Sequence, residues 1–248
     1  MTLTTILFDM DSTLIDIDED NFSREYFRLL NKLYFPEFSS KTFVTSLVEI
    51  TRNVMLSEIP EELTINTFIR EMSQSFNTSP ENVYEKINSY YDNEYDQLEK
   101  YISVNNDAIK AIEAALAKDL QIVVATTPIF PEKAILKRLT WGKIDEYDFS
   151  YITHAENMHF SKPRKEYYTE LLDILRIKPR NCIMVGNEFV ADIVAPTQLG
   201  METFYCPRDD INDKPFTSAE LNRFNKIQPT YHGTLANFAE LLDNGFEL

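Results

Sequence analysis

The stretch Thr4-Thr-Ile-Leu-Phe-Asp-Met-Asp-Ser-Thr-Leu14 lies close to the first residue of this 248-residue chain and carries its strongest fold signal. The apolar run from Ile6 to Phe8 predicts a short strand buried on both faces, as in a parallel sheet. Two acids, Asp9 and Asp11, follow directly. Buried acids are unfavourable unless a cation lies nearby, and ligands of open α/β sheets bind where strands end. The stretch therefore predicts a charged site at the carboxyl edge of such a sheet.

The overall composition is that of an ordinary globular protein, with 44% hydrophobic and 26% charged residues. No apolar run reaches the roughly 18 residues of a membrane helix, and no basic leader precedes the first strand. The formal net charge is −16, which argues against nucleic acid or an anionic membrane as a partner. A small phosphorylated substrate stays compatible, because a local site can be cationic. The two cysteines form no disulfide framework, so we expect the cytoplasm as the compartment. The protein is expected to be a monomer or a homodimer, a choice that the sequence does not decide.

Residues 16–100 show helical periodicity without a strand pattern. The apolar spacing predicts helices at about 21–35, 41–56, 64–76 and from 80 onward. The last begins with Ser79-Pro80, a capping residue followed by proline at the first helical position. This segment is therefore expected to form an all-helical bundle.

From Asn105 onward, short apolar strands alternate with amphipathic helices. The strands are expected at 121–125, 149–153, 181–185 and 202–205, and the helices at 106–118, 131–140, 164–176, 190–199 and 235–242. Such alternation predicts an α/β fold whose parallel sheet is covered on both faces. Residues 1–15 and 101–248 would form this domain. Residues 16–100 would be an inserted helical domain that lies over the site.

Polar side chains also follow the later predicted strands. Thr126 follows the strand at 121–125, Lys162 lies in Ser-Lys-Pro, and the segment Gly186-Asn-Glu-Phe-Val-Ala-Asp192 follows the strand at 181–185. Singly, each has an ordinary explanation as a helix cap, a surface turn or a helix N-terminus. Together with the two acids after the first strand, they resemble the four motifs of the haloacid dehalogenase (HAD) phosphatase superfamily. The helical insertion is similar to the C1-type cap of that family in position and length.

The resemblance implies a Rossmann-like phosphatase core and a role for each motif residue. Asp9 would attack phosphorus and form an aspartyl phosphate. Asp11 would protonate the leaving alkoxide and then deprotonate the hydrolytic water. Thr126 would donate a hydrogen bond to the phosphoryl group, and Lys162 would neutralise charge. Thr127 would lie at the same phosphate site, where a similar subgroup reading A-T-N-P-I-F-P has Asn.

The resemblance also implies a metal ion. A carboxylate pair and a dianionic phosphate repel one another, so a hard cation such as Mg²⁺ is expected. Its ligands would be the Asp9 carboxylate, the Asp11 backbone carbonyl and acids of the fourth motif. Asn187 stands where many relatives have Asp. Either it or Glu188 would therefore complete the site together with Asp192.

The sequence thus predicts a Mg²⁺-dependent phosphomonoester hydrolase acting on a small phosphorylated metabolite. A 2-haloacid dehalogenase is disfavoured, because those enzymes lack the second acid that Asp11 supplies. A phosphomutase or phosphonatase on the same fold stays open. So does a catalytically weak regulatory or scaffold protein, because Asn187 and Thr127 depart from the family pattern. Residues of the helical insertion would set the substrate, and they form no recognisable motif.

Overall fold

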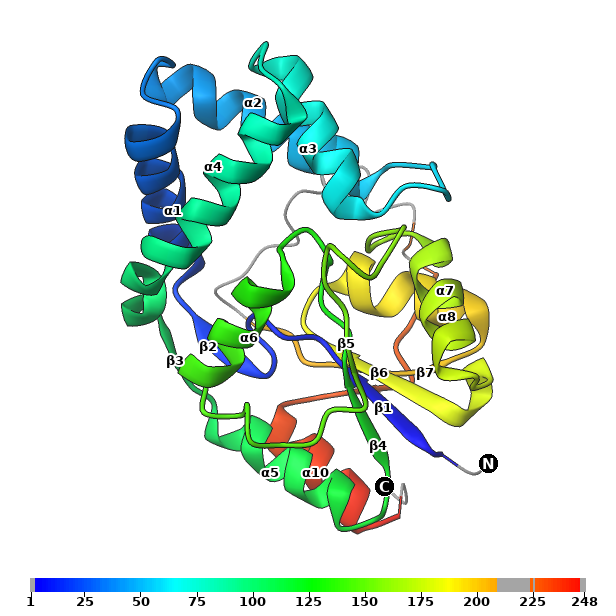
Figure 1. The fold of residues 1–248 in the computed structure, drawn as a ribbon. Coiled ribbons are helices and arrows are strands. Elements are labelled where there is room, and N and C mark those ends of the chain that lie inside the picture. The colour runs from blue at the N-terminus through cyan, green and yellow to red at the C-terminus, as the bar shows by residue number, and fades with distance from the viewer. Residues whose placement is uncertain (1–2, 209–223, 225, 246–248) are drawn as a thin grey trace.

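The centre of the molecule is a six-stranded parallel sheet (Figure 1). The computed structural model describes residues 3–208, 224 and 226–245. The strands follow the order β5-β4-β1-β6-β7-β8. They are β1 Thr5–Phe8, β4 Gln121–Val124, β5 Tyr151–Ile152, β6 Cys182–Gly186, β7 Glu202–Tyr205 and β8 Tyr231–His232. The predicted α/β fold with a parallel sheet is confirmed.

Helices cover both faces of this sheet (Figure 1). They are α5 Asn106–Leu116, α6 Glu132–Trp141, α7 Lys165–Leu175, α8 Ala195–Leu199 and α10 Leu235–Asp243. α5 and α10 pack together beneath one face, and α7 and α8 lie on the other (Figure 1). The sheet is therefore dry on both sides, and its open functional surface is the edge where the strands end.

The first strand, β1, lies inside the sheet between β4 and β6, and all of its residues are buried. Ile6 and Phe8 belong to the same hydrophobic cluster as α5 and α10, where the Phe8 and Phe238 rings meet edge to face at 5.8 Å. Leu7 points to the other face and joins the cluster of α7 and α8. A strand covered on both faces must be apolar along its length, which is why this run predicted it.

Between β1 and β4 the chain forms the helical insertion, seen at the top of Figure 1. It consists of α1 Glu19–Tyr34, α2 Ser40–Met55, α3 Thr64–Ser75, α4 Pro80–Asn93 and the 3₁₀ helix η1 Tyr95–Tyr101. The side chains of Asp18, Ser39 and Ser79 cap the first turns of α1, α2 and α4. These caps satisfy backbone N–H groups that have no partner inside a helix, and they fix where each helix begins.

Two short antiparallel strands carry the chain into and out of the helical insertion. β2 spans Ile15–Ile17 and β3 spans Ile102–Val104, with Asp16 opposite Ser103. The sequence does not predict these strands, because each has only three residues and a polar one at its centre. Their pairing brings both chain crossings to one place beside the carboxyl edge of the sheet.

The helical insertion is also held to the sheet domain at the first turn of α3. The Thr64 backbone N–H donates to the Met158 carbonyl, and the Ile65 N–H donates to the Ala155 carbonyl, both at 2.9 Å. The Thr64 hydroxyl donates to the Pro128 carbonyl at 2.7 Å. Loops of the sheet domain thus satisfy the free donors of this helix end, and the insertion lies over the carboxyl edge.

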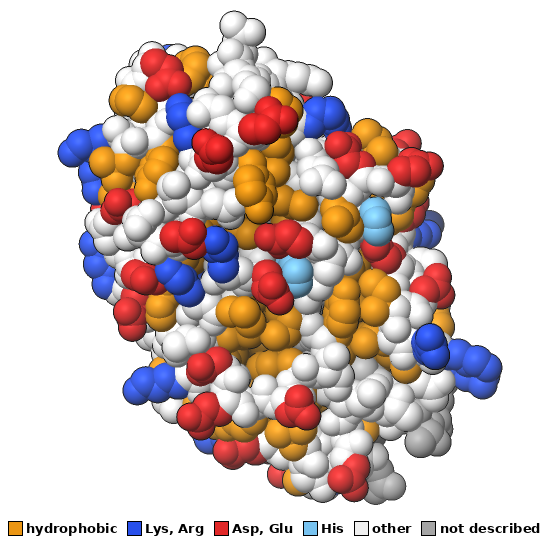
Figure 2. Space-filling model, in the orientation of Figure 1, with side chains coloured by type: hydrophobic (Ala, Val, Ile, Leu, Met, Phe, Trp, Pro, Cys, Tyr) orange, Lys and Arg blue, Asp and Glu red, His pale blue; other side chains and the backbone are white. Residues whose placement is uncertain are grey.

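On the face seen in Figure 1, acidic and basic side chains are interspersed among uncharged ones (Figure 2). Within the described residues, no helix combines the length and the apolar character that crossing a membrane requires.

We expect Phe43→Ala to destabilise the helical insertion. Phe43 is fully buried and stacks on Phe76, with ring centroids 5.4 Å apart. Removing a buried phenyl ring leaves a cavity that costs about 3–5 kcal/mol. Urea unfolding followed by circular dichroism should show this loss. The control is Leu33→Ala, which truncates a side chain that is 47% exposed and should shift the midpoint little. Equal midpoints for both variants would contradict the packing described.

Candidate active site

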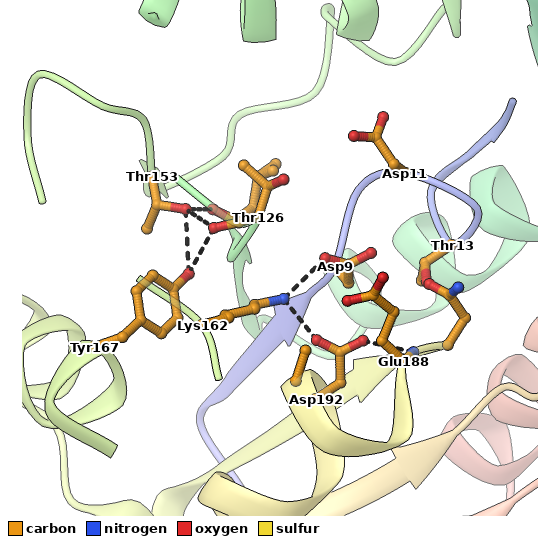
Figure 3. Close-up of polar contacts among 12 residues, drawn as sticks. Asp9, Asp11, Thr13, Thr126, Thr153, Lys162, Tyr167, Glu188 and Asp192 are labelled. Atoms are coloured by element: carbon orange, nitrogen blue, oxygen red, sulfur yellow. Dashed lines mark hydrogen bonds and ion pairs between the residues drawn. The ribbon is translucent and has the colours of Figure 1, made fainter. Parts of the chain in front are cut away.

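Two acids leave the end of β1 in different directions. The Asp9 N–H donates to the Val185 carbonyl at 2.9 Å, which continues the ladder with β6 and places Asp9 at the carboxyl edge. The Asp9 carboxylate points toward Lys162, whereas the Asp11 carboxylate points away from it (Figure 3). Ser12, next in the chain, has a φ of 61°, so the backbone turns sharply there. This loop presents two acids that are separated by one residue to different parts of one site.

Lys162 is buried between two carboxylates. Its Nζ donates to Asp9 Oδ1 at 2.8 Å and to Asp192 Oδ1 at 2.6 Å, and its side chain is 0% exposed (Figure 3). Burial alone would lower the pKa of Lys162, but Asp192 and Asp9 outweigh it and hold that pKa well above its ordinary value. The lysine is therefore charged and links the ends of β1 and β6.

Asp192 lies on a π-helical turn, Phe189–Val194, that replaces the start of the helix predicted at 190–199. Its Oδ2 accepts the Glu188 N–H at 3.0 Å, so both carboxylate oxygens are engaged. The turn packs closely over Gly186, where a Cβ would lie 2.2 Å from Asp192 Oδ2. Burial raises the pKa of Asp192, Lys162 opposes that rise, and Asp9 adds to it. Glycine before the turn is thus needed to admit this carboxylate.

Of the two candidates beside Asp192, only Glu188 lies among the acids. The Thr13 hydroxyl donates to Asn187 Oδ1 at 2.9 Å, so the amide oxygen is already engaged. The Glu188 carboxylate lies beside Asp9 (Figure 3). Burial, Asp192 and Asp9 raise the pKa of Glu188 well above its ordinary value. This crowding of acids is the kind of site that a bound cation relieves.

The donor set of this site fits Mg²⁺. Asp9 and Glu188 offer carboxylate oxygens, which a hard cation prefers. Among the described residues, no three His, Cys, Asp or Glu side chains are grouped so as to hold a metal by themselves. Mg²⁺ usually takes one or two carboxylates and completes its shell with water and substrate phosphate.

Thr126 and Thr127 form the loop after β4. The Thr126 carbonyl accepts from the Thr153 hydroxyl at 2.9 Å and from the Tyr167 hydroxyl at 3.0 Å (Figure 3). The Thr127 carbonyl accepts the Ile129 N–H at 2.9 Å, which turns the loop back. The sequence analysis did not identify Thr153 and Tyr167, whose hydroxyls hold this loop through the Thr126 carbonyl. Thr153 is the last residue of the strand predicted at 149–153, and a polar side chain at the end of a strand was the available signal.

Arg138 is a further charged residue that the sequence analysis missed. Its side chain is 1% exposed, and its Nη1 donates to Asp11 Oδ2 at 2.5 Å. Burial raises the pKa of Asp11, Arg138 opposes that rise, and Asp9 adds to it. The signal lay in α6, where Arg138 shares the inward face of the helix with Ile135 and Leu139. An arginine on such a face needs a buried acid as a partner.

Comparisons with known proteins give both sequence relatives and structural neighbours. The pyrophosphatase PpaX of Anoxybacillus flavithermus is 25% identical over 203 residues, which cover 82% of this chain and 83% of that protein. The structure of a HAD phosphatase from Thermococcus onnurineus has a TM-score of 0.59 at 15% identity and covers 97% of this chain and 98% of that one. A magnesium-bound structure of YfnB from Bacillus subtilis has a TM-score of 0.57 at 19% identity, and the match covers 98% of this chain and 100% of that one.

These two structures are similar to the chain in fold alone. The family is instead shown by a match between the sequence and a protein-family model. Residues 6–206 match the model of the haloacid dehalogenase-like hydrolases, so the match runs from the second residue of β1 to the end of β7 and includes all the site residues described above. The chain belongs to the haloacid dehalogenase-like hydrolases.

Proposed function

We propose that this hydrolase is a Mg²⁺-dependent phosphomonoesterase that acts on a small phosphorylated metabolite through an aspartyl phosphate on Asp9. The observation that carries the proposal is the buried Lys162, which touches Asp9 at 2.8 Å and Asp192 at 2.6 Å at the carboxyl edge of the sheet. The name of the relative PpaX, a pyrophosphatase, supports chemistry on a phosphoryl group. A cytoplasmic location and a monomeric or homodimeric state remain predictions.

Asp9 is the nucleophile in this proposal. Lys162 fixes Asp9 Oδ1, which orients the other oxygen for attack on phosphorus. The same ammonium offsets charge on the phosphoryl oxygens as they approach Asp9. Thr126 and Thr127 would bind those oxygens from the loop after β4, and the hydrogen bonds from Thr153 and Tyr167 keep that loop in place.

Asp11 is the general acid and base. In an in-line displacement the leaving oxygen lies on the far side of phosphorus from the nucleophile. An acid that serves this oxygen must therefore point away from Asp9, as the Asp11 carboxylate does (Figure 3). After giving its proton to the leaving group, Asp11 would take one from the water that hydrolyses the aspartyl phosphate.

Asp9, Glu188 and the backbone carbonyl of Asp11 would hold the metal. Asp192 is engaged with Lys162 and with the Glu188 N–H, so its part is to fix both of them. Asn187 is engaged with Thr13. When bound, the ion supplies positive charge against the crowded acids and the dianionic phosphate. Residues 16–100 would form the cap domain, and residues 1–15 with 101–248 would form the core.

Asp9→Asn should abolish turnover, because a neutral amide does not attack phosphorus at a useful rate. The measurement is hydrolysis of p-nitrophenyl phosphate with saturating Mg²⁺, with circular dichroism as a check on folding. A rate close to that of the unchanged protein would refute the nucleophile and, with it, the proposed mechanism.

Asp11→Asn should slow hydrolysis of an alkyl phosphate by about 10²–10⁴-fold, which is the usual contribution of general acid–base catalysis. The loss on p-nitrophenyl phosphate should be smaller, because this leaving group needs little protonation. Slower hydrolysis of the intermediate should also let phosphorylated Asp9 accumulate, and mass spectrometry would detect the added phosphoryl group. Equal losses on both substrates would argue against Asp11 as the acid.

Glu188→Gln should weaken Mg²⁺ binding about tenfold or more, because it removes a full charge from an oxygen site. Isothermal titration calorimetry with Mg²⁺ alone measures this without relying on activity. Asn187→Ala is the comparison: it removes the Thr13 contact and should affect Mg²⁺ binding less. If Asn187→Ala has the larger effect on affinity, the assignment of Glu188 is wrong.

A further inference from the structure

Arg138 is a buried cation outside the group formed by Lys162 and its acids. Its Nη1 donates to Asp11 Oδ2 at 2.5 Å, and its Nε donates to the Ala134 carbonyl at 3.4 Å. Among the described residues, Asp11 is its only ion-pair partner. A guanidinium that is removed from water is strongly unfavourable unless an acid neutralises it. The direction of the Asp11 side chain and the burial of Arg138 therefore depend on each other.

The two oxygens of Asp11 are in different situations. Oδ2 accepts from Arg138, whereas Oδ1 is buried and has no hydrogen-bond partner among the described residues. The carboxylate as a whole points away from Asp9, Lys162 and Asp192 (Figure 3). An unpartnered buried oxygen at the end of a fixed side chain needs an explanation, and a catalytic role is one that buried polar groups commonly have.

The helical insertion helps to enclose this contact. The Arg138 guanidinium lies 4.3 Å from the centre of the Phe130 ring, and Tyr26 of α1 meets that ring edge to face at 5.9 Å. Tyr95 of η1 packs on Trp141 at the end of α6, with ring centroids 5.3 Å apart. While the insertion rests on α6 in this way, the guanidinium has no route to water and remains on Asp11.

We infer that Arg138 is a positioning residue that binds Oδ2 of Asp11 and thereby leaves Oδ1 facing the leaving group. The inference rests on the proposed function, in which Asp11 is the acid. The leaving oxygen of an in-line displacement lies far from Asp9, and the hydrogen bond from Arg138 keeps Asp11 turned to that side. The arginine itself touches neither phosphorus nor nucleophile, so its effect on the rate passes through Asp11.

The experiment compares kcat and KM for p-nitrophenyl, phenyl and ethyl phosphate in Arg138→Met and Arg138→Lys. Arg138→Met should lower kcat for ethyl phosphate by about 10²-fold, at the lower end of general acid–base effects, and much less for p-nitrophenyl phosphate. KM should change little. Arg138→Lys keeps a donor and a charge, so it should recover part of the lost rate. A purely structural role would lower all three rates alike.

The double variant Asp11→Asn/Arg138→Met gives the sharpest test. If Arg138 acts only through Asp11, the double variant should be no slower on ethyl phosphate than Asp11→Asn, because the second change removes nothing further. Losses that multiply would overturn the inference. So would a leaving-group dependence in both Arg138 variants equal to that of the unchanged protein. If Arg138→Met does not fold, Arg138→Lys and its double variant with Asp11→Asn decide by the same criteria.

Arg164→Met is the matched control. Arg164 also joins the sheet domain to the helical insertion, through the Leu56 carbonyl at 3.2 Å and Glu58 at 3.1 Å, and it makes no contact with Asp11. Its loss should leave the leaving-group dependence unchanged. The same set separates the two proposals. If Asp9→Asn is inactive but the Arg138 variants keep the leaving-group dependence of the unchanged protein, the proposed function stands and the role of Arg138 is rejected. If Asp9→Asn is active, the proposed function itself is rejected.

Discussion

Lys162 donates to Asp9 and to Asp192 from a position that water does not reach, and much of the molecule serves to bring these three side chains together. Burying any one of these side chains without its partners would be unfavourable, because a buried unpaired charge costs several kcal/mol. Two acids share one ammonium here, and burial together with these acids raises the pKa of the neighbouring Glu188 well above its ordinary value. This crowding of acids is the electrostatic reason why the proposed mechanism includes a metal ion.

This constraint explains the order of the elements. Asp9 follows β1, Asp192 follows β6, and β1 and β6 are neighbours with Phe8 opposite Val185. Neighbouring parallel strands have their carboxyl ends at the same edge of the sheet, so the acids that follow β1 and β6 lie close together. The lysine comes from the loop between β5 and α7, and its long side chain reaches the gap between the two strand ends. The inserted helices arise beside the same edge, because β2 follows the Asp11 loop directly.

Much of this was predictable from sequence. The strand at β1 follows from the run Ile6–Phe8, and the convergence of Asp9, Thr126, Lys162 and Asp192 follows from polar residues placed after predicted strands. The sequence could not supply the reason for proposing Glu188 over Asn187, because that reason is the Thr13 hydroxyl, which lies far away in sequence and donates to the amide oxygen of Asn187. Arg138 was equally hidden. A charged residue on an apolar helix face shows that a partner exists, but only the packing of α6 against the Asp11 loop shows which one. The strands β2 and β3 are too short for any periodicity to appear.

The π-helical turn at Phe189–Val194 has a consequence for how this chain tolerates insertions and deletions. The hydrogen bonds of a π turn span one more residue than those of an α turn, and π turns occur mostly as single turns within α-helices. Each residue of an α-helix turns the chain by about 100°. Deleting one residue between Glu188 and Asp192 would therefore restore a regular helix and swing the carboxylate about a quarter of a turn away from Lys162. Most loops of an enzyme absorb a one-residue change in length, but this turn would convert it into the loss of a buried ion pair.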